Sequence, residues 1–191
     1  MTPAHVLAGV SFGCCSPENL GQLRTLNKAI FPINYSERMY QEILACGDVS
    51  QLAFHSGSLV GAIGCRLENT PEGIKMYIMT LGVLAPYRDQ GIGSALLMRS
   101  LAVLRDLPEV VEAYLHVQTS NEEAIRFYQR FGFEAAETVR NYYRRLDPPD
   151  AVLLRKVFAP GVADHASGYG ATAPAEGGGA QSSGCSAGDG G

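Results

Sequence analysis

Two glycines in the stretch Arg88-Asp89-Gln90-Gly91-Ile92-Gly93 have the spacing of a loop that binds phosphate groups. An apolar, strand-like run precedes the stretch, and a helix-like run follows it. The glycines would let the backbone approach an anion closely, and the first N–H groups of the helix would point toward that anion. The sequence therefore predicts that this loop binds an anionic cofactor. The alternative is an ordinary strand-to-helix turn, in which the glycines serve only tight packing.

Two common glycine-rich motifs do not fit this loop. A dinucleotide-binding fingerprint needs a third glycine where Leu96 stands, and a Walker loop needs a Gly-Lys-Ser/Thr ending that the stretch lacks. The loop is therefore predicted to hold a different anionic cofactor.

Tyr77 and His116 have the chemistry of a general base. They lie on neighbouring strand-like runs, so in a splayed sheet both could reach one cleft and hold a water between them. Such a pair could take the proton that an attacking amine must lose. The pKa of an α-amine is near 7.7–8.0 and that of a lysine near 10.4, so at pH 7 the α-amine lies only about one pKa unit from losing its proton. The alternatives are a tyrosine on a sheet face and a satisfied core histidine.

The composition fits one globular domain followed by a tail. The chain has 191 residues, 46% of them hydrophobic, which is enough for one good core. Residues 160–191 contain ten glycines, many Ala and Ser, and no Lys or Arg, so this segment is predicted to be disordered. Three of the 19 acidic residues lie there, and the other 16 nearly balance the 15 basic residues. The domain, residues 1–159, is thus close to neutral, which argues against a nucleic-acid partner.

The five cysteines predict reduced thiols. Their number is odd and they contain no C-x-x-C pair, which favours an intracellular protein over a disulfide framework or a zinc site. Nothing basic precedes Arg24, so the apolar opening is a poor signal peptide, and no apolar run approaches the ~18 residues that span a bilayer. We therefore expect a soluble cytoplasmic protein without a metal, with the nucleus as a second location.

Hydrophobic periodicity predicts the element order β-α-α-β-β-β-α-β-α-β-β. Ser16-Pro17 predicts the start of the first helix, and Gly47 predicts a left-handed end of the second. Ser120 and Glu123 form a predicted capping box at the fourth. The predicted strands are Val6–Phe12, Gln51–His55, Leu59–Glu68, Ile74–Val83, Ala113–Val117, Phe133–Val139 and Ala151–Phe158, and the second to fourth form an antiparallel meander. The predicted helices lie between Pro17 and Ile30, Ser36 and Gly47, Gly91 and Leu101, and Ser120 and Phe131.

The loop and the element order resemble those of the GNAT superfamily of acetyltransferases. Four further stretches resemble, from roughly Val6 to Phe158, the catalytic subunits of the NatE class of N-terminal (N-alpha) acetyltransferases. They are Phe31-Pro32-Ile33-x-Tyr35, Tyr77-Ile78-Met79-Thr80-Leu81-Gly82, Tyr114-Leu115-His116-Val117-Gln118-Thr119-Ser120-Asn121 and Asn141-Tyr142-Tyr143. The departures are Ile33, where valine is usual, the Asp89-Gln90 pair and the glycine-rich tail. The resemblance implies the α/β (α+β) GNAT fold: a mixed, mostly antiparallel twisted sheet of about seven strands, splayed between the fourth and fifth, with about four helices.

The resemblance also implies a pocket for a substrate methionine. Its wall would come from Phe31, Pro32, Ile33, Tyr35 and Met79, and the hydroxyls of Tyr142 and Tyr143 would close over the peptide backbone. A mostly apolar, aromatic site would accept an uncharged side chain and reject charged ones, which it would leave desolvated and unpaired. The alternatives for these segments are a plug that packs the helices and an ordinary aromatic loop.

Acetyl-CoA is the cosubstrate that the resemblance implies. The backbone from Met79 to Val83, with Leu81 and Val83, would bind the pantetheine arm. The pyrophosphate would lie on Arg88, Asp89, Gln90, Gly91, Ile92, Gly93 and Ser94, where the Asp89-Gln90 pair weakens its attraction only modestly if both side chains face solvent. Asn121 and Tyr128 would contact the pantetheine and thioester, with Tyr128 donating to the leaving sulfur. The alternative for Tyr128 is core packing beside Phe127.

The expected activity is acetylation of the α-amine of proteins that begin with methionine followed by a hydrophobic or other non-Pro residue. No cysteine is placed as a nucleophile, so direct attack in a ternary complex is expected over an acyl-enzyme. One alternative is a protein-lysine acetyltransferase. The other is a non-catalytic acetyl-CoA-binding subunit, and the presence of Tyr77 and His116 argues against it. The resemblance implies an auxiliary scaffold subunit, a second catalytic subunit and, through them, the ribosome as partners, and neither a membrane nor direct nucleic-acid binding.

Overall fold

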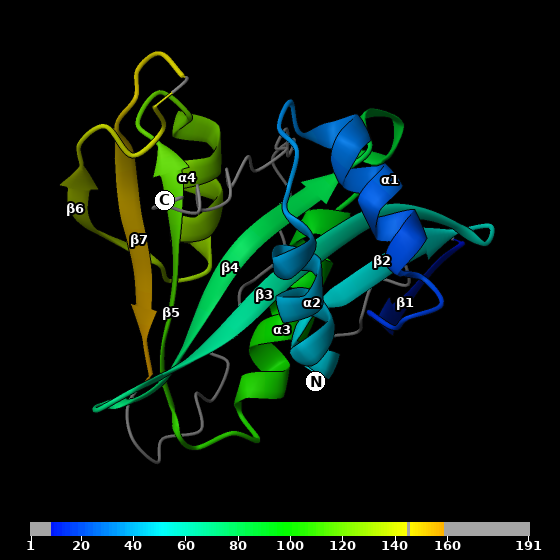
Figure 1. Cartoon of the computed structure of the whole chain (residues 1–191), viewed down its shortest axis with the longest axis horizontal. Helices are drawn as coiled ribbons and strands as arrows, with labels where there is room; N and C mark the ends of the chain where they lie inside the picture. Colours follow the sequence, from blue (N-terminus) through cyan, green and yellow to red (C-terminus); the bar gives the residue numbers. More distant parts are fainter. Residues whose placement is uncertain (1–8, 145, 159–191) are drawn as a thin grey trace.

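The computed structural model describes residues 9–144 and 146–158, which form one seven-stranded sheet with four α-helices (Figure 1). The strands are β1 Val10–Cys14, β2 Gln51–His55, β3 Ser58–Thr70, β4 Gly73–Val83, β5 Val110–Gln118, β6 Glu134–Val139 and β7 Ala151–Val157. The helices are α1 Leu20–Ile30, α2 Glu37–Ala45, α3 Ile92–Leu104 and α4 Glu122–Arg130, with short 3-10 turns η1 Gly47–Val49 and η2 Ala85–Tyr87. The predicted fold and element order are confirmed. The tail predicted for residues 160–191 and the first residues of the first predicted strand lie outside the described residues.

Two predicted helix starts are wrong. Ser16 does not cap α1, because the Asn19 side chain accepts a hydrogen bond from the Ser16 N–H and donates one to the Cys14 carbonyl, which holds a turn ahead of Leu20. At α4 the cap is Asn121 and not Ser120, since the Asn121 Oδ1 accepts from the Ala124 N–H at 3.1 Å. The predicted left-handed residue after α2 is confirmed, with Gly47 at φ +51°.

The strand order is β1-β2-β3-β4-β5-β7-β6, and every neighbouring pair is antiparallel except β4 with β5. The parallel β4–β5 register starts at Ile74↔Val110 and ends at Tyr77↔Tyr114. Beyond that point β4 continues to Val83 beside β3, and β5 continues to Gln118 beside β7. The two strands therefore diverge in the middle of the sheet, as Figure 1 shows.

A β-bulge lies where this divergence begins. In the β3–β4 register, Gly64 faces Thr80 while Cys65 faces Ile78, so Met79 is an extra residue on β4. A bulge bends its strand and increases the local twist. The bend in β4 thus coincides with the loss of its pairing to β5.

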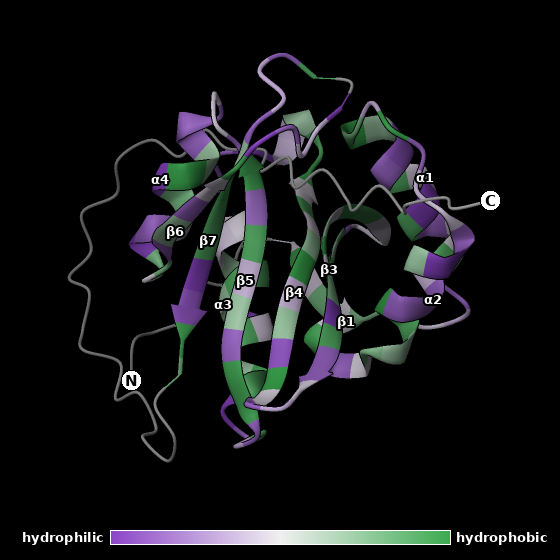
Figure 2. Cartoon of the chain, turned by 60° about the vertical axis from the view of Figure 1, so that its left-hand side comes forward, coloured by the Kyte–Doolittle hydropathy of each residue, from purple (hydrophilic) through white to green (hydrophobic). Residues whose placement is uncertain are grey.

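Helices cover both faces of the sheet and enclose two apolar clusters. On one face, α1 and α2 pack residues such as Leu23 and Ile43 against Tyr77 and Met79. On the other, α3 and α4 enclose a larger cluster that includes Leu96. Figure 2 shows hydrophobic residues along β4 and β5, and hydrophilic residues on the outer side of α4. Within residues 9–144 and 146–158, no helix has the length and apolarity needed to cross a membrane.

Gly64 allows α2 to approach the sheet closely. A Cβ on this residue would lie 2.6 Å from Ile43 Cδ1 and 2.8 Å from Thr80 Oγ1. Ile43 and Thr80 are both buried, so neither can move into solvent. The absence of a side chain at Gly64 therefore sets the spacing between α2, β3 and β4.

We expect Gly64→Ala to lower the free energy of unfolding by about 1–3 kcal/mol, the usual cost of overpacking a core. Gly21→Ala is the matched control, because a Cβ at Gly21 in α1 would meet nothing within 4 Å. That control should gain about 0.5–1 kcal/mol from helix propensity. Urea unfolding of the two variants measures both values, and equal stability would refute the close approach.

Candidate active site

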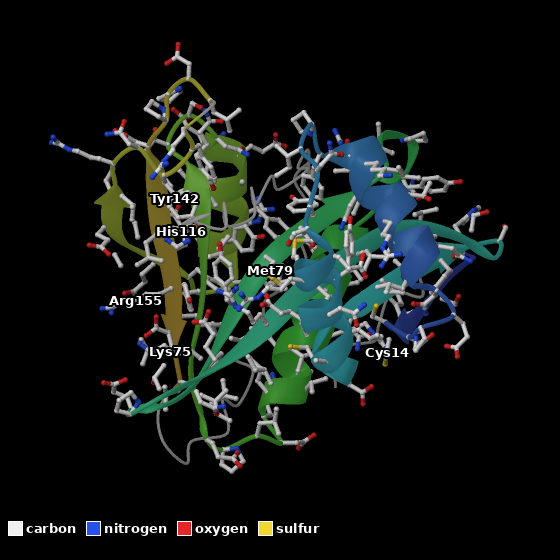
Figure 3. All side chains as sticks on the ribbon, viewed as in Figure 1. Cys14, Lys75, Met79, His116, Tyr142 and Arg155 are labelled. Atoms are coloured by element: carbon white, nitrogen blue, oxygen red, sulfur yellow. The ribbon has the colours of Figure 1, made fainter. Side chains whose placement is uncertain are left out.

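Tyr77 and His116 meet at the point where β4 and β5 separate, together with a residue from the loop between β6 and β7. Their ring centroids lie 5.9 Å apart. Tyr142 stacks on His116 with centroids 4.1 Å apart at 13°, and its hydroxyl lies 3.0 Å from the Tyr77 hydroxyl. Figure 3 shows His116 and Tyr142 side by side and Met79 across the divergence on β4. The three rings form one cluster, which we call the catalytic cluster after the role predicted for Tyr77 and His116.

The electrostatics of His116 suit a neutral imidazole. Burial lowers the pKa of His116 to about 4. Its buried Nδ1 has no hydrogen-bond partner among the described residues. At pH 7 the ring is therefore uncharged, and it can accept a hydrogen bond from a group that enters the site.

Tyr142 and Tyr143 play different structural parts, although they are adjacent in the sequence. Tyr143 is buried, its hydroxyl donates to the His116 carbonyl at 3.1 Å, and its N–H donates to the Pro149 carbonyl at 2.7 Å. These bonds tie the loop to β5 beside the site. The Tyr142 hydroxyl, in turn, lies beside that of Tyr77. Peptide binding by both tyrosines stays a prediction.

The predicted pocket residues lie between α1 and α2, against the end of β4. Phe31 is buried and makes an edge contact with Tyr35, with centroids 5.8 Å apart at 81°. The Phe31 ring lies 3.0 Å from the Cβ position of Gly82, so a larger residue there would crowd the ring. Ile33 is half-buried and Pro32 is exposed. Tyr35 packs against the apolar cluster that contains Met79 and Tyr77, so Tyr35 and the catalytic cluster share one face of the sheet.

The glycine loop has the geometry of an anion cradle. Gly91 caps α3 with φ +76°, a left-handed conformation that favours glycine. Arg88 Nε donates to the Val83 carbonyl at 3.1 Å, which holds the arginine beside the end of β4. Asp89 and Gln90 are both exposed, but Asp89 also lines the hollow at this loop, so only Gln90 meets the condition for a modest effect on phosphate attraction.

A hollow at this loop includes three residues that the sequence did not single out as cofactor ligands. Tyr87 contributes from η2, and Phe127 and Arg130 contribute from α4. The loop residues that line it are Val83, Arg88, Asp89, Gly91, Ile92, Gly93 and Ser94. Helical spacing shows that Phe127 and Arg130 share a face. The sequence does not show that this face meets α3, which depends on how the sheet packs the two helices.

Tyr128 is fully buried in α4, and its hydroxyl has no hydrogen-bond partner among the described residues. Burial raises the pKa of Tyr128, so the group stays a neutral donor. A buried hydroxyl without a partner is costly and fits a site that a ligand completes. Asn121, predicted to contact the same ligand, uses its Oδ1 to cap α4.

Comparison with known proteins identifies the family of this chain. The model of the acetyltransferase (GNAT) family matches residues 20–133. The chain belongs to this family. It is 44% identical over 147 residues to N-alpha-acetyltransferase 50 of Danio rerio, covering 77% of this chain and 88% of that protein. It is 38% identical over 151 residues to the probable N-acetyltransferase san of Drosophila melanogaster, covering 79% and 82%.

A solved structure gives the same family. Arabidopsis thaliana Naa50 in complex with the bisubstrate analogue CoA-Ac-MVNAL aligns with a TM-score of 0.74 and 45% identity, over 78% of this chain and 99% of that one. The chain is therefore an N-alpha-acetyltransferase that uses acetyl-CoA. The cradle at Gly91 and the unpartnered Tyr128 hydroxyl fit this cosubstrate: they would hold its phosphates and its sulfur.

We expect Gly91→Asp to abolish measurable CoA binding, because it puts a carboxylate where the pyrophosphate would lie. Gly91→Asn is the matched control, since asparagine has nearly the same shape, tolerates the left-handed conformation and carries no charge. Isothermal titration of CoA should show much weaker binding by the Asp variant than by the Asn variant. Unchanged affinity in the Asp variant would refute the cradle.

Proposed function

We propose that this acetyltransferase acts on the α-amine of peptides and proteins that begin with methionine. The observation that carries the proposal is that the catalytic cluster and the apolar Phe31–Tyr35 segment lie on one face of the sheet, where β4 and β5 separate. The cosubstrate loop at Gly91 opens the helix α3, on the other face. An amine and a thioester that approach from opposite faces would meet in the divergence between the strands.

The amine nitrogen would attack the thioester carbonyl directly. The new C–N bond forms, the C–S bond breaks, and the proton lost by the nitrogen balances the one that the sulfur gains. Tyr77 and His116 would take the amine proton through a water as general base. Tyr128 would donate to the leaving sulfur, because its buried hydroxyl is a neutral donor. Tyr142 and Tyr143 would hold the peptide backbone.

Methionine selectivity would come from Phe31, Pro32, Ile33, Tyr35 and Met79. Phe31 and Met79 are buried and apolar, and Tyr35 closes the segment at its other end. A charged first side chain would lose its water there without gaining a partner. A neutral imidazole at His116 also suits an α-amine, which deprotonates about two to three units below a lysine.

The wider setting is part of the proposal. A catalytic domain over residues 1–159 would be followed by a disordered tail in a cytoplasmic protein. Its partners would be an auxiliary scaffold subunit and a second catalytic subunit, and through them the ribosome. The support for these partners is the sequence resemblance to the NatE class.

The decisive experiment compares acetyl transfer to Met-Leu, Ser-Glu and internal-lysine peptides, with the α-amine blocked on the last. We expect kcat/KM for the Met-Leu peptide to exceed that for the other peptides by at least about tenfold. This is the discrimination that an apolar group bound in a pocket can provide. Equal turnover, or a preference for lysine, would remove the specificity claim.

The same assay on the double variant Tyr77→Phe/His116→Ala tests the base. Turnover should fall by roughly 10²–10⁴-fold, the usual contribution of a positioned base. A double variant with intact turnover would show that other groups take the proton.

A further inference from the structure

A network of charged and hydroxyl groups lies directly beside the catalytic cluster, on the α1/α2 face of the sheet. Arg66 on β3 donates from Nε to Glu68 Oε1 at 2.9 Å and from Nη1 to Glu42 Oε2 of α2 at 3.3 Å. Tyr114 on β5 donates its hydroxyl to the other Glu68 oxygen at 2.5 Å. The network therefore runs from α2 through β3 to β5, and it passes across β4.

Tyr77 is the residue of β4 that this network passes. The strand register sets Arg66 opposite Tyr77 and Tyr77 opposite Tyr114, so the three side chains share a face. The Arg66 guanidinium lies 5.1 Å from the Tyr77 ring centroid. The Tyr114 ring lies 4.9 Å from it at 37°. The Tyr77 ring thus has a cation on one side and an aromatic ring on the other, both bound to the same carboxylate.

The network behaves as a unit because its members are largely withdrawn from water. The side chains of Arg66, Glu68 and Glu42 are 27%, 28% and 23% exposed. Burial raises the pKa of Tyr114, and its hydrogen bond to Glu68 raises it further, so the hydroxyl remains a neutral donor. Removal of one ionic partner would leave the other charge poorly compensated.

We propose that Arg66 and Tyr114, joined through Glu68, are positioning residues that fix the Tyr77 ring so that its hydroxyl stays directed into the catalytic cluster. Tyr77 needs such support because the β4–β5 pairing ends at Tyr77 itself and the bulge at Met79 follows two residues later. Contacts from β3 and β5 take over the restraint that continued strand pairing would provide. This inference rests on the proposed role of Tyr77 in proton removal.

Arg66→Met should lower kcat about tenfold, because a side chain displaced by a fraction of an ångström loses part of its catalytic effect. The KM values for peptide and acetyl-CoA should change less than about twofold, since Arg66 contacts Glu42, Glu68 and Tyr77, which are not among the proposed binding residues. Arg66→Lys keeps the cation but not the two-pronged hydrogen bonding, and should give an intermediate kcat. A rise in KM at constant kcat would contradict a positioning role.

A double-mutant cycle separates positioning from a general structural effect. In a Tyr77→Phe background there is no hydroxyl to position, so Arg66→Met should change kcat less than about twofold. The same factor in both backgrounds would overturn the inference. Glu112→Gln is the matched control, because it breaks a different ion pair on the same two strands. In that pair Lys75 Nζ lies 3.6 Å from Glu112 Oε2, and the two residues precede Tyr77 and Tyr114 by two positions. This variant should leave kcat unchanged. Figure 3 shows Lys75 away from His116, toward the lower end of the sheet.

Two further results keep this inference distinct from the proposed function. If Tyr77→Phe alone leaves kcat intact, the assigned base is wrong, and the positioning claim falls with it. If Tyr77→Phe lowers kcat but Arg66→Met does not, only the positioning claim falls.

Should Arg66→Met fail to fold, Tyr114→Phe replaces it, because it keeps the ring and removes only the bond to Glu68. Tyr114→Phe should lower kcat severalfold in the protein that retains Tyr77 and should not lower it in the Tyr77→Phe variant. An equal loss of kcat in both would refute the positioning role.

Discussion

The end of the parallel pairing between β4 and β5 at Tyr77 and Tyr114 is the constraint on which the site depends. Up to that row the strands share hydrogen bonds, and beyond it each follows a different neighbour. The divergence opens the middle of an otherwise continuous sheet. A sheet that stayed paired would keep an amine on one face apart from a thioester on the other.

The residues around this row show how the divergence is supported. The bulge at Met79 bends β4, and the Phe31 ring packs on Gly82 at the far end of the same strand. On β5, the His116 carbonyl accepts a hydrogen bond from the Tyr143 hydroxyl, which ties the loop after β6 to this strand. Each strand is thus held by side chains where it lacks its neighbour. Local packing in this way substitutes for the missing ladder of hydrogen bonds.

The element order, the sheet and the glycine turn that opens α3 could be predicted from the sequence, because apolar periodicity and two spaced glycines are local signals. Two helix starts could not be predicted from the sequence. At α4 the neighbouring residue Asn121 caps the helix in place of Ser120. Before α1 the Asn19 side chain binds Ser16 and Cys14 in a turn, and no side chain caps the helix. The hydroxyl contact of Tyr142 with Tyr77 and the place of Arg130 at the loop depend on tertiary packing. No local pattern encodes them. The same holds for the network of Arg66, Glu68 and Tyr114, in which Glu68 and Tyr114 are 46 positions apart in the sequence.

The central claim is that an α-amine carrying a methionine side chain and an acetyl thioester meet in the divergence of β4 and β5. The most direct measurement is the affinity, by calorimetry, of a conjugate in which CoA is joined through an acetyl bridge to the α-amine of a Met-Leu peptide. The comparison is the same conjugate joined to the side-chain amine of an internal lysine. The α-linked conjugate should bind at least about tenfold more tightly, because only it places its side chain in the apolar pocket. Equal affinities, or tighter binding of the lysine conjugate, would contradict the claim.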